Sequence, residues 1–125
     1  MKYYAVLDTN VLVSAMLKTG SVPGHVVAEA LKGDIIPVLN GDILTEYEDV
    51  LNRPKFRFDK RAVYSDYGLI EDEIPDPKDV IFYAVLMEKR KEDDAYLVTG
   101  NIKHFPLRTY IVTPRELLDI IEEGR

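Results

Sequence analysis

Short apolar runs alternate along this chain with longer stretches in which apolar residues recur every three or four positions. The runs at 4–7, 35–39, 95–98 and 110–112 predict buried strands. Apolar residues at helical spacing predict helices that start near 11, 23, 43, 78 and 114. Strands separated by helices indicate an α/β fold with a mainly parallel sheet and helices on both faces, because right-handed crossovers are the usual connection.

Caps and turns divide the pattern into its elements. Gly33 is expected to end the second helix, near Lys32, and 113–116 form a capping box with proline at the first helical position. Residues 59–73 are the least regular; there Asp59 could cap a short helix through Tyr67, with a loop at 74–77. The residues expected to face inward are Val26, Val27, Ala30, Leu31, Ile43, Leu44, Tyr47, Val50, Leu51, Phe82, Val85, Leu86, Lys89, Leu117, Leu118, Ile120 and Ile121.

Length and composition predict one ordinary globular domain spanning 1–125, since the apolar fraction is 46% and no repeat or linker divides the chain. The absence of cysteine excludes disulfides and thiolate metal sites. No apolar stretch approaches the roughly 20 residues that span a bilayer, and no signal peptide precedes the first strand. These features predict a cytoplasmic protein with no membrane contact.

The net charge of −6 argues against nucleic-acid binding by bulk electrostatics, but it leaves room for a local basic surface. Cations crowd residues 53–61, where two phenylalanines interleave with them, as in surfaces that stack on bases. A solvated surface beside a helix end explains the same cluster equally well. The residues proposed to bind RNA are Arg53, Lys55 and Arg57.

Three acids fall near the ends of predicted elements. Asp8 directly follows the first strand, Glu46 lies in the first turns of the helix after the second strand, and Asp79 begins the helix before the third. Carboxyl ends of parallel strands share one sheet edge, where α/β folds place their ligands. Each acid also has an ordinary explanation: Asp8 as a helix cap, Glu46 as a surface residue, and Asp79 as a charge favoured by the helix dipole.

Taken together, the acids point to a metal. Three carboxylates brought close without a cationic partner would repel one another, and a divalent cation would relieve that repulsion. Oxygen ligands in a chain without cysteine favour Mg²⁺ or Mn²⁺ over zinc. Such a site suits hydrolysis of phosphodiesters.

An ordered series of motifs closely resembles the PIN-domain nucleases, in particular the bacterial and archaeal group regarded as toxin components of toxin–antitoxin systems (VapC-like ribonucleases). The series covers nearly the whole chain, and its order is more specific than any one motif. The motifs are AVLDTNVLVSA at 5–15, ILTEY at 43–47, RPKF at 53–56, DPKD at 76–79, LVTGN at 97–101 and IVTPRE at 111–116.

The resemblance implies a three-layer α/β/α sandwich that cleaves RNA with Mg²⁺ or Mn²⁺, in which Asp8, Glu46 and Asp79 are the catalytic and metal-binding acids. It also implies a homodimer held inactive by a cognate antitoxin protein. Many relatives carry a fourth acid where this chain has Asn101, with His104 nearby; that histidine is equally well explained as a surface residue. The residues expected to support the site from outside the ligand shell are Thr9, Asn10, Thr99, Asn101 and Asp76, although caps and strand-end hydroxyls explain most of them as well.

The sequence leaves two other functions open. A haloacid-dehalogenase-type phosphatase also uses an aspartate after its first strand, but it requires a second aspartate two residues later, where this chain has Asn10. A catalytically degenerate PIN domain that binds RNA or a protein without cleavage is the stronger alternative, because the fourth acid is missing.

Overall fold

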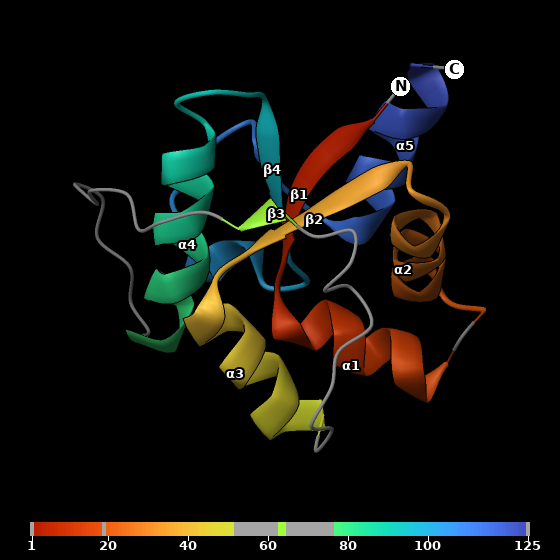
Figure 1. Ribbon diagram of the computed structural model, residues 1–125. Helices are drawn as coiled ribbons and strands as arrows, with labels where there is room; N and C mark the ends of the chain where they lie inside the picture. Colours follow the sequence, from red (N-terminus) through yellow and green to blue (C-terminus); the bar gives the residue numbers. More distant parts are fainter. Residues whose placement is uncertain (1, 19, 52–62, 65–76, 125) are drawn as a thin grey trace.

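The computed structural model describes residues 2–18, 20–51, 63–64 and 77–124 (Figure 1). In this part of the chain, five strands form one sheet in the order β3-β2-β1-β4-β5, and every pair is parallel. The elements are β1 (Tyr3–Leu7), α1 (Thr9–Leu17), α2 (Val22–Lys32), β2 (Ile35–Leu39), α3 (Gly41–Leu51), β3 (Val63–Tyr64), α4 (Pro77–Lys89), β4 (Ala95–Val98), the 3₁₀ helix η1 (Ile102–His104), β5 (Ile111–Val112) and α5 (Pro114–Glu123).

Helices cover both faces of the sheet. Helix α4 packs across β1, β2 and β4 on one face, whereas α2 and α5 pack together on the other, over β2 and β5 (Figure 1). Helix α1 leaves the end of β1 and contacts both α2 and α3. The predicted α/β fold with a parallel sheet between helical layers is therefore confirmed.

The edge strand β3 was not expected from the sequence. Val63 pairs with Val38 and Tyr64 with Leu39, so the predicted short helix through Tyr67 is wrong at these positions. A β-branched and an aromatic residue suit an extended edge, and β2 offers a free edge for backbone hydrogen bonds. That partner is distant in sequence, and local periodicity cannot reveal it. The rest of the predicted helix, and most of the predicted loop at 74–77, lie outside the described residues.

The core contains most of the residues that were expected to face inward. Val27, Leu44, Leu118 and Ile120 lie half-buried at its margin, and the side chain of Leu51 is outside the described residues. The prediction is wrong for Leu31 and Val50, which are 44% and 48% exposed. The residues that were predicted to face inward and are buried in the core are Val26, Ala30, Ile43, Tyr47, Phe82, Val85, Leu86, Leu117 and Ile121.

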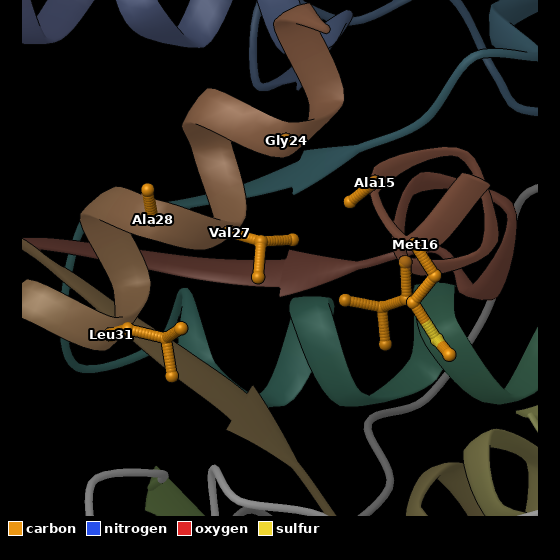
Figure 2. A pocket seen from close by; sticks show the side chains of 7 residues that line it. Ala15, Met16, Gly24, Val27, Ala28 and Leu31 are labelled. Carbon is orange, nitrogen blue, oxygen red and sulfur yellow. The ribbon is translucent and has the colours of Figure 1, made fainter. Parts of the chain in front are cut away.

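Leu31 belongs to an apolar groove on the surface between α1 and α2 (Figure 2). The groove has a volume of about 340 Å³, and Met16 and Val27 also line it. Both helices are too short to span a membrane; within the described residues only the bent pair α1–α2, with 105° between its halves, reaches the necessary length and hydropathy.

Lys89 faces inward as predicted, with only 7% exposed. Its ammonium group lies 4.3 Å from the ring centroid of Tyr4 and 3.0 Å from a carboxylate oxygen of Asp93. Burial lowers the pKa of Lys89, but the hydrogen bond and negative charge of Asp93, with the charge of Glu92, raise it above its ordinary value. Packing of the charged end against a ring and an acid explains how a lysine can be buried here.

The predicted capping box of α5 is present. Thr113 Oγ1 accepts a hydrogen bond from the Glu116 backbone N–H at 3.1 Å, and the Glu116 carboxylate accepts one from the Thr113 N–H at 2.9 Å. Pro114 occupies the first helical position, as expected.

Replacing Thr113 by alanine should lower the free energy of unfolding by about 1 kcal/mol, because the Glu116 N–H loses its side-chain acceptor. Urea unfolding measures this change. Glu116→Gln keeps both hydrogen bonds of the box and serves as the control, with an expected change below about 0.5 kcal/mol. An equal loss in both variants would contradict the capping argument.

Candidate active site

The sheet register brings several polar residues to one level. Leu7 pairs with Val98, which pairs with Val112, so the residues that follow these strands lie side by side at the carboxyl edge. Asp8 donates its backbone N–H to Val98 O, and Thr99 donates to Val112 O, each at 2.9 Å. The edge predicted to hold the site therefore begins with Asp8 and Thr99.

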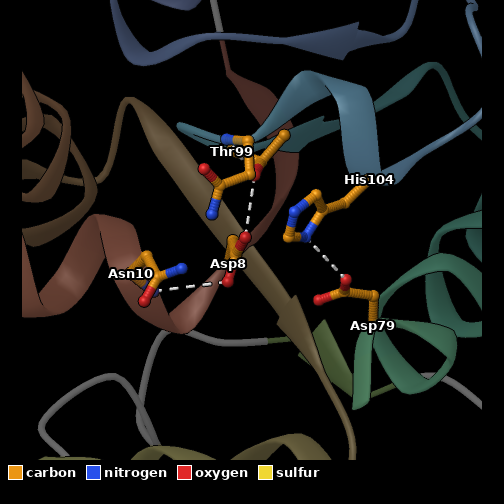
Figure 3. A network of polar contacts seen from close by, with 6 residues as sticks. Asp8, Asn10, Asp79, Thr99 and His104 are labelled. Atoms are coloured by element: carbon orange, nitrogen blue, oxygen red, sulfur yellow. Dashed lines mark hydrogen bonds and ion pairs between the residues drawn. The ribbon is translucent and has the colours of Figure 1, made fainter. Parts of the chain in front are cut away.

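Asp8 is buried, with 5% exposed, and both of its carboxylate oxygens accept hydrogen bonds (Figure 3). Oδ2 accepts from the Thr99 hydroxyl at 2.7 Å, and Oδ1 accepts from the Asn10 backbone N–H at 3.3 Å. The second contact makes Asp8 the N-cap of α1, which begins at Thr9 rather than near Val11. The capping role considered from the sequence is thus present, but it uses only one of the two oxygens.

The charge on Asp8 has no counter-charge among the described residues, because no lysine, arginine or histidine there lies within ion-pair distance. A buried carboxylate is costly unless it is paired, and two neutral donors supply only part of the lost solvation. A carboxylate oxygen has more than one lone pair, so each oxygen of Asp8 can still accept another partner. This is the electrostatic setting in which a cation binds.

Tyr47 fixes α3 against the sheet beside Asp8. Its hydroxyl donates a hydrogen bond of 2.5 Å to the carbonyl of Leu7, the residue before Asp8, and only 1% of Tyr47 is exposed. Burial, and then the negative charge of Asp8, raise the pKa of Tyr47 well above its ordinary value. From the sequence, Tyr47 is expected only to face the core; the signal that points to its hydrogen bond is that a buried tyrosine hydroxyl usually needs an acceptor.

Asp79 contacts His104 at the same edge. The Nδ1 atom of His104 lies 3.2 Å from Asp79 Oδ2, and the two side chains are 49% and 14% exposed (Figure 3). Since His104 lies in η1, just beyond β4, this contact places the start of α4 at the carboxyl edge, which the sequence alone left undecided. His104 is half-exposed, as a surface histidine would be, but its ring also orients Asp79.

The supporting residues form a short chain of hydrogen bonds. Thr99 is fully buried, and its hydroxyl donates to Asp8 while accepting from the Asn101 backbone N–H at 2.9 Å. The side chains of Asn10 and Asn101 are exposed. Thr9 is buried, and its hydroxyl has no hydrogen-bond partner within the described residues. Thr99 thus ties Asp8 to the loop that follows β4.

Within the part of the chain that the structure describes, Asp8, Glu46 and Asp79 are not gathered into one metal-binding cluster. Glu46 is half-buried on α3, next in sequence to Tyr47, and among the described residues no three histidine, aspartate or glutamate side chains lie close enough to hold a metal. Asp8 and Asp79 share the carboxyl edge but make separate contacts (Figure 3). Asp76 and the proposed RNA-binding residues Arg53, Lys55 and Arg57 lie outside the described residues.

Comparison with known families adds the deciding observation. A family model described as PIN domain matches residues 4–103. The chain belongs to the PIN-domain family. Searches of the curated proteins and of the solved structures returned no match. The matched segment of this PIN domain contains Asp8, Glu46, Asp79 and Thr99, and it ends one residue before His104.

PIN domains are typically nucleases and generally use divalent metals. The donor chemistry of the edge fits such an ion: the buried Asp8 carboxylate, which has no counter-charge among the described residues, the carboxylate of Asp79 and the amide of Asn101 all offer hard oxygen ligands. The asparagine is neutral, so it would bind an ion more weakly than a fourth acid. These residues therefore suit a divalent ion in the type of ligand that they offer. Asp8 is the ligand whose position and contacts are best defined.

Proposed function

We propose that this PIN domain is a divalent-metal-dependent endoribonuclease. The observation that carries the proposal is the buried Asp8 carboxylate, held at the carboxyl edge of the sheet without a counter-charge in the described part of the chain. In a PIN-domain chain, a side chain of this kind is expected to meet a cation rather than to serve as a cap alone. The substrate class is RNA, as the motif series implies.

In this proposal, Asp8, Glu46 and Asp79 would hold the ion, which would have to draw them closer together than they lie among the described residues. Bound Mg²⁺ or Mn²⁺ would lower the pKa of a water and offset charge on phosphodiester oxygens. Thr99 and the Asn10 N–H fix the two oxygens of Asp8, while His104 orients Asp79. Asn101 would hold a water or act as a neutral ligand. Such outer contacts typically contribute 10- to 100-fold to metal affinity or activity.

The biological setting proposed is that of a toxin paired with a cognate antitoxin, acting in the cytoplasm as a homodimer. The motif series that resembles toxin components supports this setting. Arg53, Lys55 and Arg57 would guide RNA to an otherwise acidic domain, since net charge −6 gives no general attraction for phosphates.

A second function is a degenerate PIN domain that binds RNA or a protein without cutting. Two observations favour it: Asn101 stands where many relatives have an acid, and no three-acid cluster forms among the described residues. Loss of a negative ligand weakens ion binding while leaving the fold and its surfaces intact.

A titration of Mn²⁺ against end-labelled RNA separates the two functions. The nuclease is expected to shorten the RNA with a rate that rises with Mn²⁺ and returns to background when EDTA removes the ion. Gel mobility in the same samples measures binding. RNA that shifts in mobility but keeps its length at every Mn²⁺ concentration would replace the nuclease by the binding module.

A further inference from the structure

A cavity of about 290 Å³ opens at the carboxyl edge, next to the candidate active site. It lies between the first turns of α1, the start of α2, the loop after β4 and the start of α5. Its volume lies just below the range usual for small-molecule sites, about 300–1,000 Å³, and therefore suits one small ring system. Its lining is Asn10, Val11, Val13, Ser14, Pro23, Gly100, Asn101 and Pro114.

The cavity is joined to Asp8 by hydrogen bonds on both of its sides. Asn10 donates its N–H to Asp8, and Asn101 donates its N–H to Thr99, whose hydroxyl donates to Asp8. Asn10 and the Asp79–His104 pair flank Asp8 on opposite sides (Figure 3). An RNA strand bound across Asp8 would therefore reach the Asp79–His104 pair on one side and the cavity on the other.

The lining of the cavity is neutral. The described residues that line it include no lysine, arginine, aspartate or glutamate, so they offer neither the cations that a phosphate needs nor the carboxylates that a metal needs. Its polar groups include the exposed amides of Asn10 and Asn101 and the hydroxyl of Ser14. An amide presents a donor and an acceptor together, which is how asparagine recognises the edge of a base. Pro23 and Pro114 add apolar surface for the ring.

We propose that this cavity binds the nucleobase adjacent to the cleaved phosphodiester, and that it sets base preference at that one position. The proposal rests on the proposed RNA cleavage for its location in the reaction. Single-stranded RNA is recognised mainly through splayed bases that are held at their edges and faces, and this cavity offers both kinds of contact beside the candidate catalytic acid.

The first test compares cleavage rates of four RNA oligonucleotides that differ in one base beside the cut site. The wild type should discriminate at least tenfold between the best and worst base. Ser14→Leu fills the cavity and should reduce this ratio below threefold. Ala28→Leu makes a similar enlargement on an exposed position of α2, in the apolar groove instead, and should keep the wild-type ratio. Equal cleavage of all four RNAs by the wild type, or an unchanged ratio in Ser14→Leu, would overturn the proposal.

The second test does not need cleavage. Metal-free wild-type protein is titrated with the four nucleoside 5′-monophosphates, and ribose 5-phosphate serves as the control for sugar and phosphate. Backbone amide signals of Ser14, Gly100 and Asn101 should shift by base-dependent amounts and stay unchanged with ribose 5-phosphate. Shifts that are identical for all five compounds would overturn base binding. Base-dependent shifts in a protein that cuts no RNA would support the base site and count against the nuclease.

Discussion

Replacing Asp8 by asparagine is expected to lower the rate of metal-dependent RNA cleavage by about 100-fold or more. The substitution keeps the size of the side chain and leaves an oxygen that can accept from Thr99 or from the Asn10 N–H, but it removes the negative charge. Removing one pre-positioned electrostatic group from an active site typically costs about 10²–10³ in rate. Single-turnover cleavage of a labelled RNA at saturating Mn²⁺ measures the effect.

The same variant separates catalysis from stability. Without metal, Asp8→Asn should keep or slightly raise the free energy of unfolding, because a buried charge without a counter-charge in the described chain becomes neutral. Asp49→Asn, an exposed acid on α3, is the matched control and should leave both quantities unchanged. Retained cleavage in Asp8→Asn would remove this residue from the mechanism. A fall in stability of more than about 1 kcal/mol would mean that the cap is its main role.

The fold could be read from the sequence because its main signals are local. Buried parallel strands are short apolar runs. Helices such as α5 are indicated by a capping box and by apolar residues at helical spacing. Thr113 and Pro114 lie where the pattern placed them. The alternation of the two kinds of element then leaves few topologies open.

The failures share one physical cause, which is dependence on distant partners. Val63–Tyr64 is a strand because β2 offers a free edge to it. Leu31 and Val50 follow the helical period, yet they lie beyond the width of the buried stripe, and this width depends on what packs against each helix. No local pattern contains that information.

The candidate site was predictable in part. Asp8 was placed at the carboxyl edge by the end of its strand, and Thr99, named as a supporting residue, donates a hydrogen bond to it there. The contact between His104 and Asp79 depends on how η1 faces α4, so the sequence could only name the two residues separately. The hydrogen bond from Tyr47 to Leu7 joins residues 40 positions apart. The sequence thus predicts which side chains have the chemistry that the site needs. The residues that they contact are decided by tertiary packing.

Replacing Tyr47 by phenylalanine should lower the free energy of unfolding by about 1–3 kcal/mol at neutral pH. The ring still fills its place in the core, but the buried Leu7 carbonyl loses the hydroxyl donor. Tyr96→Phe in β4 is the control, because this side chain is only half-buried, and its expected change is below about 0.5 kcal/mol. Urea unfolding at pH 7 gives both values.

The raised pKa of Tyr47 adds a dependence on pH with a definite sign. In the unfolded chain this hydroxyl ionises near its ordinary value of 10.0, whereas burial and the charge of Asp8 keep it protonated in the folded protein. Above pH 10 the unfolded state therefore binds fewer protons than the folded state, and stability falls as pH rises, by up to about 1.4 kcal/mol per pH unit from this residue. Phenylalanine cannot ionise, so the stability advantage of the wild type over Tyr47→Phe should shrink between pH 9 and pH 11. An advantage that stays constant over this range would show that the hydroxyl ionises alike in both states, and α3 would then lack the neutral hydrogen bond that fixes it beside Asp8.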